Sequence, residues 1–301
     1  MRQKKESDKK KRWYFNMNKY FSKKDYSKLN YNKRYERAIG MSSNIFDILS
    51  EVEEWDGLGK KGKSYCYAFT YYYLQTWLYM YCKYEIIQIN FDTPMAKVIK
   101  SMIGVSPNNK TFDFITKEGG ILDKYNLTKT IPYKQCPVKR YISEEGEVSF
   151  TIEEDYYSGI DGANFGSQSG NTKVKEPLLS TRERVIDGEL YDGSYSDKRM
   201  TFMTDFEVFI YCMENEDIGF IGFTLYMFMM NNKNKYGKAF GITIDRICES
   251  IKLSDREVYR RLSALEKRKM ITINRSRNEN GKNNTNIYSL KIKVDNFEKL
   301  Y

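Results

Sequence analysis

Apolar residues recur on one face of two short segments near the C-terminal end of the chain. In residues 243–251 they fall at positions 244, 247, 248 and 251, a spacing that predicts an amphipathic helix. The pattern breaks at residues 252–253. A second helix is predicted from Ser254, because Ser254 and Glu257 have the spacing of a capping box. The apolar side of this second helix carries Val258, Leu262 and Leu265.

Two runs of alternating apolar and polar residues follow the second helix. They occupy residues 270–274 and 286–293, and a polar tip at 275–284 that contains Asn280-Gly281 separates them, which predicts a β-hairpin. Helix, tight turn, helix and hairpin is the order of elements in a helix-turn-helix with a wing. Residues 241–293 therefore resemble the winged-helix DNA-binding proteins, and this resemblance implies that the second helix enters the major groove.

The side of the second helix opposite its apolar stripe is basic and polar. Guanidinium forks match the edges of guanine, and hydroxyl and amine groups bind phosphates. The alternative is a solvated charged face, but the capping box, the basic stripe and the basic hairpin tip together favour DNA binding. The candidate DNA-binding residues are Ser254, Arg256, Tyr259, Arg260, Arg261, Ser263 and Lys267 on the helix, with Arg275, Arg277 and Lys282 in the wing.

Residues 61–157 repeat this order of elements in a weaker form. The stretch that begins at Phe69-Thr70 parallels the one that begins at Phe223-Thr224, and each opens a charge-free apolar helix. Because the predicted second helix of this copy is close to neutral, we expect a degenerate winged helix that forms a homodimer or binds DNA weakly. The predicted elements are helices at 93–105 and 108–118 and a hairpin of 121–125 with 133–141.

Residues 64–82 contain no charged residue, which raises the question of a membrane span. Seven tyrosines, Gln75 and two threonines would be costly in hydrocarbon, so the segment is predicted as a buried aromatic helix. Such a helix has more aromatic surface than one small domain normally hides, and surface left over would mark an interface between subunits.

Composition excludes several kinds of chemistry. The chain has no histidine, which removes histidine-dependent hydrolases and histidine-ligated metal sites. Its five cysteines form no C-x-x-C pair and are expected to be free thiols, as in a reducing cytoplasm. The acidic residues of 144–155 carry no metal-binding motif and are predicted to be a solvated loop, although a nuclease would need them to bind metal. We therefore expect no enzyme activity, no metal and no cofactor.

Positive charge is concentrated at the two ends of the 301-residue chain, whose net charge is +10. Residues 1–40 hold 14 basic and 4 acidic residues among eight aromatic ones, and residues 241–301 hold 14 basic and 8 acidic residues. The first segment is either a solvated tail or an arm that lies along phosphates and stacks on bases or a partner. Residues 158–200, rich in Gly, Ser, Asn and Asp, are predicted to be a linker or mobile loop.

The expected fold is α+β and mainly helical, with two winged-helix domains joined by a polar Gly/Ser-rich linker. Two winged helices in about 300 residues resemble the replication initiators of plasmids and phages, which implies that one dimerises or binds a half-site while the other binds the origin repeat. We expect a cytoplasmic, sequence-specific double-stranded DNA-binding protein that acts as an initiator or a transcriptional regulator of a mobile element. The alternative is a protein-interaction module that uses its winged helices as docking surfaces. The predicted parts are an arm and lead-in helix at 1–60, a first winged helix at 61–157, the linker at 158–200 and a second winged helix at 201–301.

Overall fold

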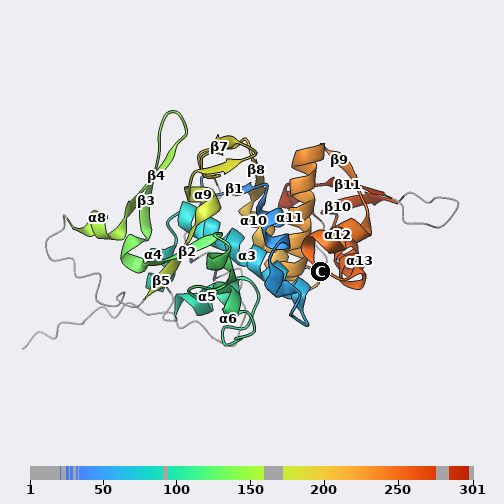
Figure 1. The fold of residues 1–301 in the computed structure, drawn as a ribbon, viewed down its shortest axis with the longest axis horizontal. Helices are drawn as coiled ribbons and strands as arrows, with labels where there is room; N and C mark the ends of the chain where they lie inside the picture. Colours follow the sequence, from blue (N-terminus) through green and yellow to red (C-terminus); the bar gives the residue numbers. More distant parts are fainter. Residues whose placement is uncertain are drawn as a thin grey trace, which may run out of the picture.

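The fold is that of a computed structural model, which describes residues 34–90, 94–158, 172–275 and 285–297, with residues 21, 25, 26, 28, 29 and 32. Over these ranges the protein is α+β, with helices as the main element and small antiparallel sheets of two or three strands. Figure 1 shows the C-terminal elements at one end of the molecule, strands β3 (Pro137–Ile142) and β4 (Val148–Ile152) at the other, and helix α3 (Lys61–Met80) between them.

Helices α3 and α11 (Gly219–Tyr236) pack against each other at the centre of the molecule. Both are apolar around most of their circumference, which is the pattern of a helix covered on all sides. Rings on the two helices meet directly, with the centroids of Tyr73 and Phe223 4.9 Å apart and those of Phe69 and Phe223 6.3 Å apart. The prediction of a buried aromatic helix in residues 64–82 is confirmed, and no helix in the described ranges is long and apolar enough to cross a membrane.

Two threonines hold the crossing of α3 and α11 in a reciprocal arrangement. Thr70 donates to the carbonyl of Phe220 at 3.3 Å, and Thr224 donates to the carbonyl of Cys66 at 3.1 Å. The two hydroxyl oxygens lie 3.2 Å apart. Phe220 lies four residues before Thr224, and Cys66 lies four residues before Thr70. The two helices therefore contact each other through equivalent positions, as in a local two-fold arrangement.

The C-terminal elements follow the predicted order closely. After α11 come β9 (Ala239–Ile242), α12 (Ile244–Ile251), α13 (Asp255–Lys267), β10 (Ile271–Asn274) and β11 (Asn286–Leu290). The strands form one antiparallel sheet in the order β10-β11-β9. The hydroxyls of Thr243 and Ser254 cap α12 and α13 by accepting from the backbone N–H of Arg246 at 3.2 Å and of Glu257 at 3.4 Å. We call α11 to β11 the C-terminal unit.

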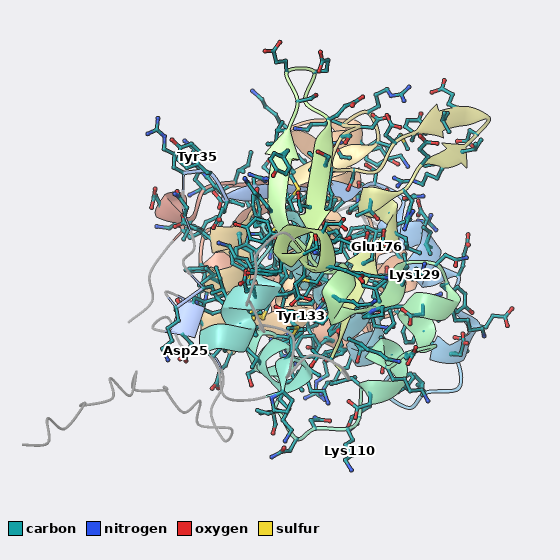
Figure 2. The ribbon with its side chains drawn as sticks, turned by 90° about the vertical axis from the view of Figure 1, so that its left-hand side faces the viewer. Asp25, Tyr35, Lys110, Lys129, Tyr133 and Glu176 are labelled. Atoms are coloured by element: carbon teal, nitrogen blue, oxygen red, sulfur yellow. The ribbon has the colours of Figure 1, made fainter. Side chains whose placement is uncertain are left out.

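The middle of the chain differs from its predicted elements. The helices predicted at 93–105 and 108–118 are shorter, since they appear as α5 (Met95–Met102) and α6 (Asp113–Thr116). Residues 121–124, predicted as a strand, form helix α7 (Ile121–Lys124), and the predicted hairpin with 133–141 is wrong. Instead β2 (Thr128–Pro132) pairs with β5 (Lys173–Pro177), while β3 pairs with β4. Figure 2 shows β3 and β4 standing side by side as a projecting hairpin.

Residues 172–200 are not a linker. They contain β5, α9 (Leu178–Thr181), β6 (Arg184–Ile186) and β7 (Glu189–Tyr191), and the buried residues of both halves of the chain form one connected core. The described part of the predicted linker is therefore folded into that core, and residues 159–171 of the predicted segment lie outside the described residues. The remaining elements are β1 (Ala38–Ser42), which pairs with β8 (Thr201–Asp205), and α2 (Ile45–Ser50), η1 (Glu53–Trp55), α4 (Tyr84–Asn90), η2 (Tyr133–Gln135), α8 (Glu153–Tyr157), α10 (Phe206–Glu214) and η4 (Val294–Asn296).

Two further expectations about aromatic surface are corrected. Within the segment predicted as a solvated tail or DNA-binding arm, Phe21 and Tyr26 are buried, and Tyr26 donates to the carbonyl of Met102 at 2.8 Å. The other aromatic residues of 1–31 lie outside the described residues. The aromatic surface of α3, which suggested a homodimer interface, is covered by elements of the same chain, with Trp77 stacked on Phe206 at 3.8 Å.

The first turn of α3 lies directly against the turn between α12 and α13. A Cβ atom added at Gly62 would stand 2.5 Å from the carbonyl oxygen of Lys252 and 2.8 Å from a methyl carbon of Leu253. Only glycine permits this approach without movement of the turn. The α12–α13 turn is thereby fixed to the central helix pair.

We predict that Gly62→Ala lowers the free energy of unfolding by about 1–3 kcal/mol, because the added methyl group overpacks the contact. This loss is expected although alanine favours a helix over glycine by up to about 1 kcal/mol. Gly59→Ala is the matched control, because a Cβ at Gly59 meets nothing within 4 Å. Urea unfolding of the two variants measures the difference, and equal midpoints for both would contradict the close contact.

Candidate nucleic-acid interface

Helix α13 has one buried side and one exposed side. Val258, Leu262 and Leu265 are buried and face the α11 side of the unit, as the apolar spacing predicts. Besides Asp255 in the first turn, the exposed residues are Arg256, Tyr259, Arg260, Ser263 and Lys267, and 58% of Tyr259 is accessible. At 100° per residue these five positions lie within one stripe of the helix surface. The predicted outward stripe is therefore present as a continuous polar face, which we call the α13 face.

The α13 face carries both free and paired cations. Arg260 donates to Glu257 at 2.6 Å, and 59% of its side chain remains accessible. No ion pair involves Arg256 or Lys267 within the part of the chain that the structure describes. Exposed pairs of this kind contribute little to stability, so a phosphate can replace the carboxylate at small cost. The face is thus positive and adaptable.

Glu257 is held ionised by its neighbours. Burial raises its pKa, but hydrogen bonds from Arg260 and Arg261 outweigh that effect and leave the pKa below its ordinary value. Its carboxylate is therefore turned toward these two arginines, whereas the capping box predicted a bond back to Ser254. Ser254 itself is exposed and caps α13 through its hydroxyl, so its oxygen acts first as a helix cap.

Arg261 does not belong to the α13 face, which corrects its assignment as a DNA-binding residue. Only 8% of it is exposed. Its Nη1 donates to the carbonyls of Asp217 at 2.5 Å and Ile218 at 3.0 Å, and its Nε donates to Glu257 at 2.8 Å. These carbonyls belong to the turn before α11, so the guanidinium points inward and joins α13 to the central helix pair.

A second buried arginine strengthens the same junction. Arg268, directly after α13, forms a two-pronged ion pair with Asp217, with distances of 2.8 and 3.1 Å. Its guanidinium also lies 6.0 Å from the centre of the Tyr211 ring. Bidentate pairs restrict orientation as well as distance. The two arginines therefore fix how the α13 face is presented.

The structure describes only the edges of the predicted wing. Arg275, at the end of β10, is exposed and pairs with Glu266 on α13 at 2.5 Å. Arg277 and Lys282 lie outside the described residues, as does most of the polar tip between β10 and β11. Of the predicted wing residues, Arg275 is therefore the one that the structure places, and it lies beside the end of α13.

Charged residues of the segments predicted as a first winged helix form internal pairs. Lys100 on α5 pairs with Asp113 on α6. Lys175 on β5 donates to both carboxylate oxygens of Asp123 on α7 at 2.7 Å. Burial raises the pKa of Asp123, but bonds from Lys175, Thr128 and Thr130 outweigh it and lower that pKa. These charges join elements of the first half of the chain to each other.

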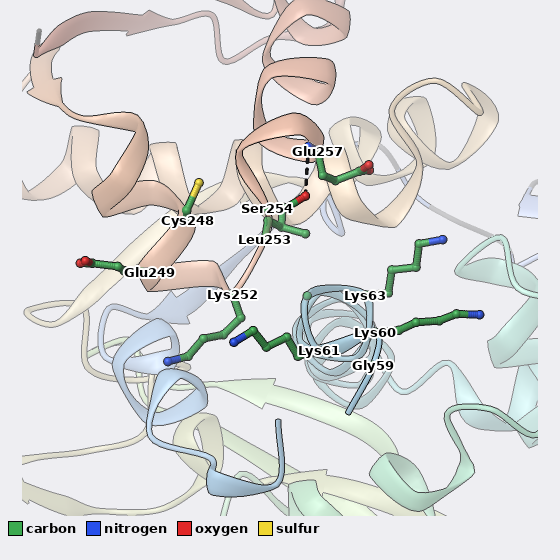
Figure 3. A pocket seen from close by; sticks show the side chains of 11 residues that line it. Gly59, Lys60, Lys61, Lys63, Cys248, Glu249, Lys252, Leu253, Ser254 and Glu257 are labelled. Atoms are coloured by element: carbon green, nitrogen blue, oxygen red, sulfur yellow. Dashed lines mark hydrogen bonds between the residues drawn. The ribbon is translucent and has the colours of Figure 1, made fainter. Parts of the chain in front are cut away.

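An open pocket of about 610 Å³ lies between the first turn of α3 and the α12–α13 turn. Four lysines line it, and they come from two distant segments of the chain. Figure 3 shows Lys61 and Lys252 pointing to one side of the pocket, and Lys60 and Lys63 pointing to the side where Glu257 lies. Cys248 also lines the pocket, and burial raises the pKa of its thiol to about 12, so the thiol is protonated at neutral pH.

The sequence contains a signal for these lysines that the charge distribution alone does not reveal. Residues 57–64 have the spacing G-x-x-x-x-G-K-S of a phosphate-binding loop. In a phosphate-binding loop of nucleotide hydrolases this motif joins a strand to a helix, but here the short helix η1 precedes it, and the sheets in the described ranges are antiparallel. The motif thus marks the basic first turn of α3 without the fold of a nucleotide hydrolase.

No protein-family model, curated protein or solved structure matches this chain. Within the described ranges, no group of three or more acidic or cysteine residues is placed to hold a metal ion. The chemistry of the site therefore has to be inferred from the α13 face and the pocket beside it.

Two arginines five positions apart on α13 should behave in opposite ways. Arg261→Met is expected to lower the free energy of unfolding by about 2–4 kcal/mol, because it leaves Glu257 and the buried carbonyls before α11 without their donor. Arg256→Met, on the exposed side of the same helix, should change it by less than about 0.5 kcal/mol. Urea unfolding at pH 7 measures both free energies. If Arg261→Met lost as little stability as is expected of Arg256→Met, Arg261 would not be a structural residue.

Proposed function

We propose that this protein binds double-stranded DNA in a sequence-specific manner, with the α13 face in the major groove. The observation that carries this proposal is the division of α13 into a buried apolar side and an exposed side with Arg256, Arg260 and Lys267. An α-helix with its side chains is about 10–12 Å wide, and the major groove of B-DNA is about 12 Å wide. A polar helix that protrudes with its cations accessible fits that groove.

The order and pairing of the C-terminal elements support a winged-helix unit. Helix α11 is followed by β9, the α12–α13 pair, and strands β10 and β11, and β11 lies between β10 and β9 in the sheet. In this assignment α13 is the recognition helix, and the connection from β10 to β11 is the wing. Arg275, with Arg277 and Lys282 farther along the wing, then contacts the backbone or the minor groove.

The central helix crossing supports a second, degenerate winged helix in the first half of the chain. If Thr70 and Thr224 are equivalent, α3 corresponds to α11, α5 to α12, the α6–α7 segment to α13, and the β2–β5 pair to the β10–β11 pair. Helix α3 packs on α6 and β5, as α11 packs on α13 and β11. The segment between β2 and β5, which contains β3 and β4, then takes the place of the wing as a long insertion.

The residues of the α13 face have separate roles in this proposal. Arg256 and Arg260 donate to guanine edges, Ser263 and Lys267 bind phosphates, and Tyr259 contacts a base or sugar through its ring or hydroxyl. With two such winged-helix units, the protein would act as a replication initiator or a transcriptional regulator of a mobile element. Mapping bound sites on the source genome separates the two, since initiation requires sites grouped at one origin and regulation requires sites at promoters.

The test begins with duplexes selected from a random library by the full-length protein. Arg260→Ala is expected to weaken binding to the selected duplex by about 1–3 kcal/mol and to relax preference at one base pair, because one set of donors to a base edge is lost. Lys267→Ala should weaken selected and scrambled duplexes alike. Fluorescence anisotropy at fixed salt measures both effects.

Arg199→Ala is the matched control, since Arg199 is an exposed arginine paired with Asp197 far from α13 in the sequence. It should leave affinity and base preference unchanged. If Arg260→Ala binds with the parent's affinity and preference, the α13 face is not the recognition surface. A parent protein whose duplex affinity does not fall with salt would favour the protein-interaction alternative, because phosphate contacts release counterions.

A further inference from the structure

We infer that the lysine pocket between α3 and the α12–α13 turn binds phosphates of the same DNA duplex whose major groove receives α13. The pocket is lined by Lys60, Lys61, Lys63 and Lys252. This inference rests on the proposed function and extends it, because it adds a phosphate-binding surface of which three lysines, those of residues 60, 61 and 63, come from outside the C-terminal unit. None of these four lysines belongs to α13 or to the wing.

The charge balance of the pocket favours an anion. Four lysines line it against two carboxylates, those of Glu249 and Glu257. Glu257 is already engaged by Arg260 and Arg261, and the carboxylate of Glu249 lies 3.5 Å from Arg246. Lys60, Lys63 and Lys252 have no ion pair within the described ranges, and Lys61 has one long contact of 3.6 Å with exposed Asp56. The four lysines therefore line the pocket without matching negative charge from the protein, with Lys60 and Lys63 on the Glu257 side and Lys61 and Lys252 on the other.

Position connects the pocket with the α13 face. Glu257 lines the pocket and also accepts a hydrogen bond from Arg260, so one residue of α13 separates the pocket from the recognition stripe. When a helix fills a groove of about its own width, the sugar–phosphate backbones run along its two flanks. Lys60 and Lys63 point to the Glu257 side near the start of α13, which is where one backbone passes, and Lys61 and Lys252 extend the basic lining to the other side of the pocket.

Because the two segments that form the pocket are held together, the proposed phosphate contact depends on the position of the lysines as well as on their charge. The close approach of Gly62 to Lys252 and Leu253 holds the two lysine-bearing segments together. The lysines consequently keep a fixed position relative to Arg256 and Arg260. Phosphate contacts of this kind set the orientation of a recognition helix and carry no base preference of their own.

The test uses the full-length protein with Lys60, Lys63 and Lys252 all changed to Gln. The slope of log affinity against log salt should fall in magnitude by about 2–3, since each lost phosphate contact reduces it by about 0.9. The ratio of affinities for selected and scrambled duplexes should stay within about threefold of the parent's. Changing the same three lysines to Arg should keep the parental slope, because the charges remain.

A charge-matched control replaces Lys129, Lys139 and Lys198 with Gln; these are exposed lysines on other elements of the structure. Figure 2 shows Lys129 on the face of the molecule opposite the C-terminal end. The inference is overturned if the pocket variant keeps the parental slope, or if the control lowers the slope by the same amount. It is also overturned if the parent binds ATP saturably, the pocket variant loses that binding, and the duplex slope is unchanged, because the pocket would then serve a free nucleotide.

Failure of the inference can be told apart from failure of the proposed function. If Arg260→Ala relaxes base preference while the pocket variant behaves as the parent, α13 recognises DNA and the pocket does not contact it. If Arg260→Ala has no effect on preference, the proposed function itself fails. Lys60 and Lys63 are exposed, so the double change at these two positions serves as a second variant should Lys252→Gln disturb the turn.

Discussion

The crossing of α3 and α11 is the contact on which the other parts of the molecule depend. Each helix is buried along most of its length, and their threonine hydroxyls bond to each other's backbone at the point of closest approach. Hydroxyls buried between apolar helices must find partners. Thr70 bonds to the Phe220 carbonyl across the crossing, and Thr224 lies 3.1 Å from the Cys66 carbonyl across it and 2.9 Å from the Phe220 carbonyl of its own helix. The crossing thereby fixes which residues of the two halves face each other, and the C-terminal unit inherits its position from it.

The arginines of α13 and its C-terminal end show how one short helix serves two purposes. Arg261 and Arg268 point inward and bind the turn before α11, whereas Arg256 and Arg260 remain exposed. A planar guanidinium can satisfy several carbonyls at once, which makes arginine suitable for a buried junction. The inward pair uses this property to hold the helix, and the outward pair leaves its donors available to another molecule.

Local signals in the sequence predict the C-terminal elements well, because their causes are local. Thr243 and Ser254 cap their helices from within four residues, and the apolar spacing around Val258 already separates the two sides of α13. The burial of Arg261 is not a local property. It depends on the carbonyls of Asp217 and Ile218, more than forty residues earlier, and at the flank of the helix a side chain of this length can turn either way.

The first half of the chain is harder to predict for the same reason. The partner of β2 is β5, and more than forty residues stand between their first positions, so the turn signals near 121–141 point to the wrong pairing. Residues 172–200 have the polar, glycine-containing composition of a linker, yet Lys175 completes a buried pair with Asp123 and Ser194 donates to the carbonyl of Gly40 at 2.9 Å. The composition of this segment shows only that it is polar. Its long-range contacts show that it is ordered.

The contact at Gly62 has a consequence for how this protein can change over evolutionary time. A side chain at position 62 is compatible with the fold only if the backbone at 252–253 takes another path, and a changed turn would move α13. A substitution at position 62 alone, or a change in the turn at 252–253 alone, would disrupt the contact between them. In an alignment of related chains, we therefore expect position 62 and the α12–α13 turn to covary, although nearly 190 residues of sequence lie between them.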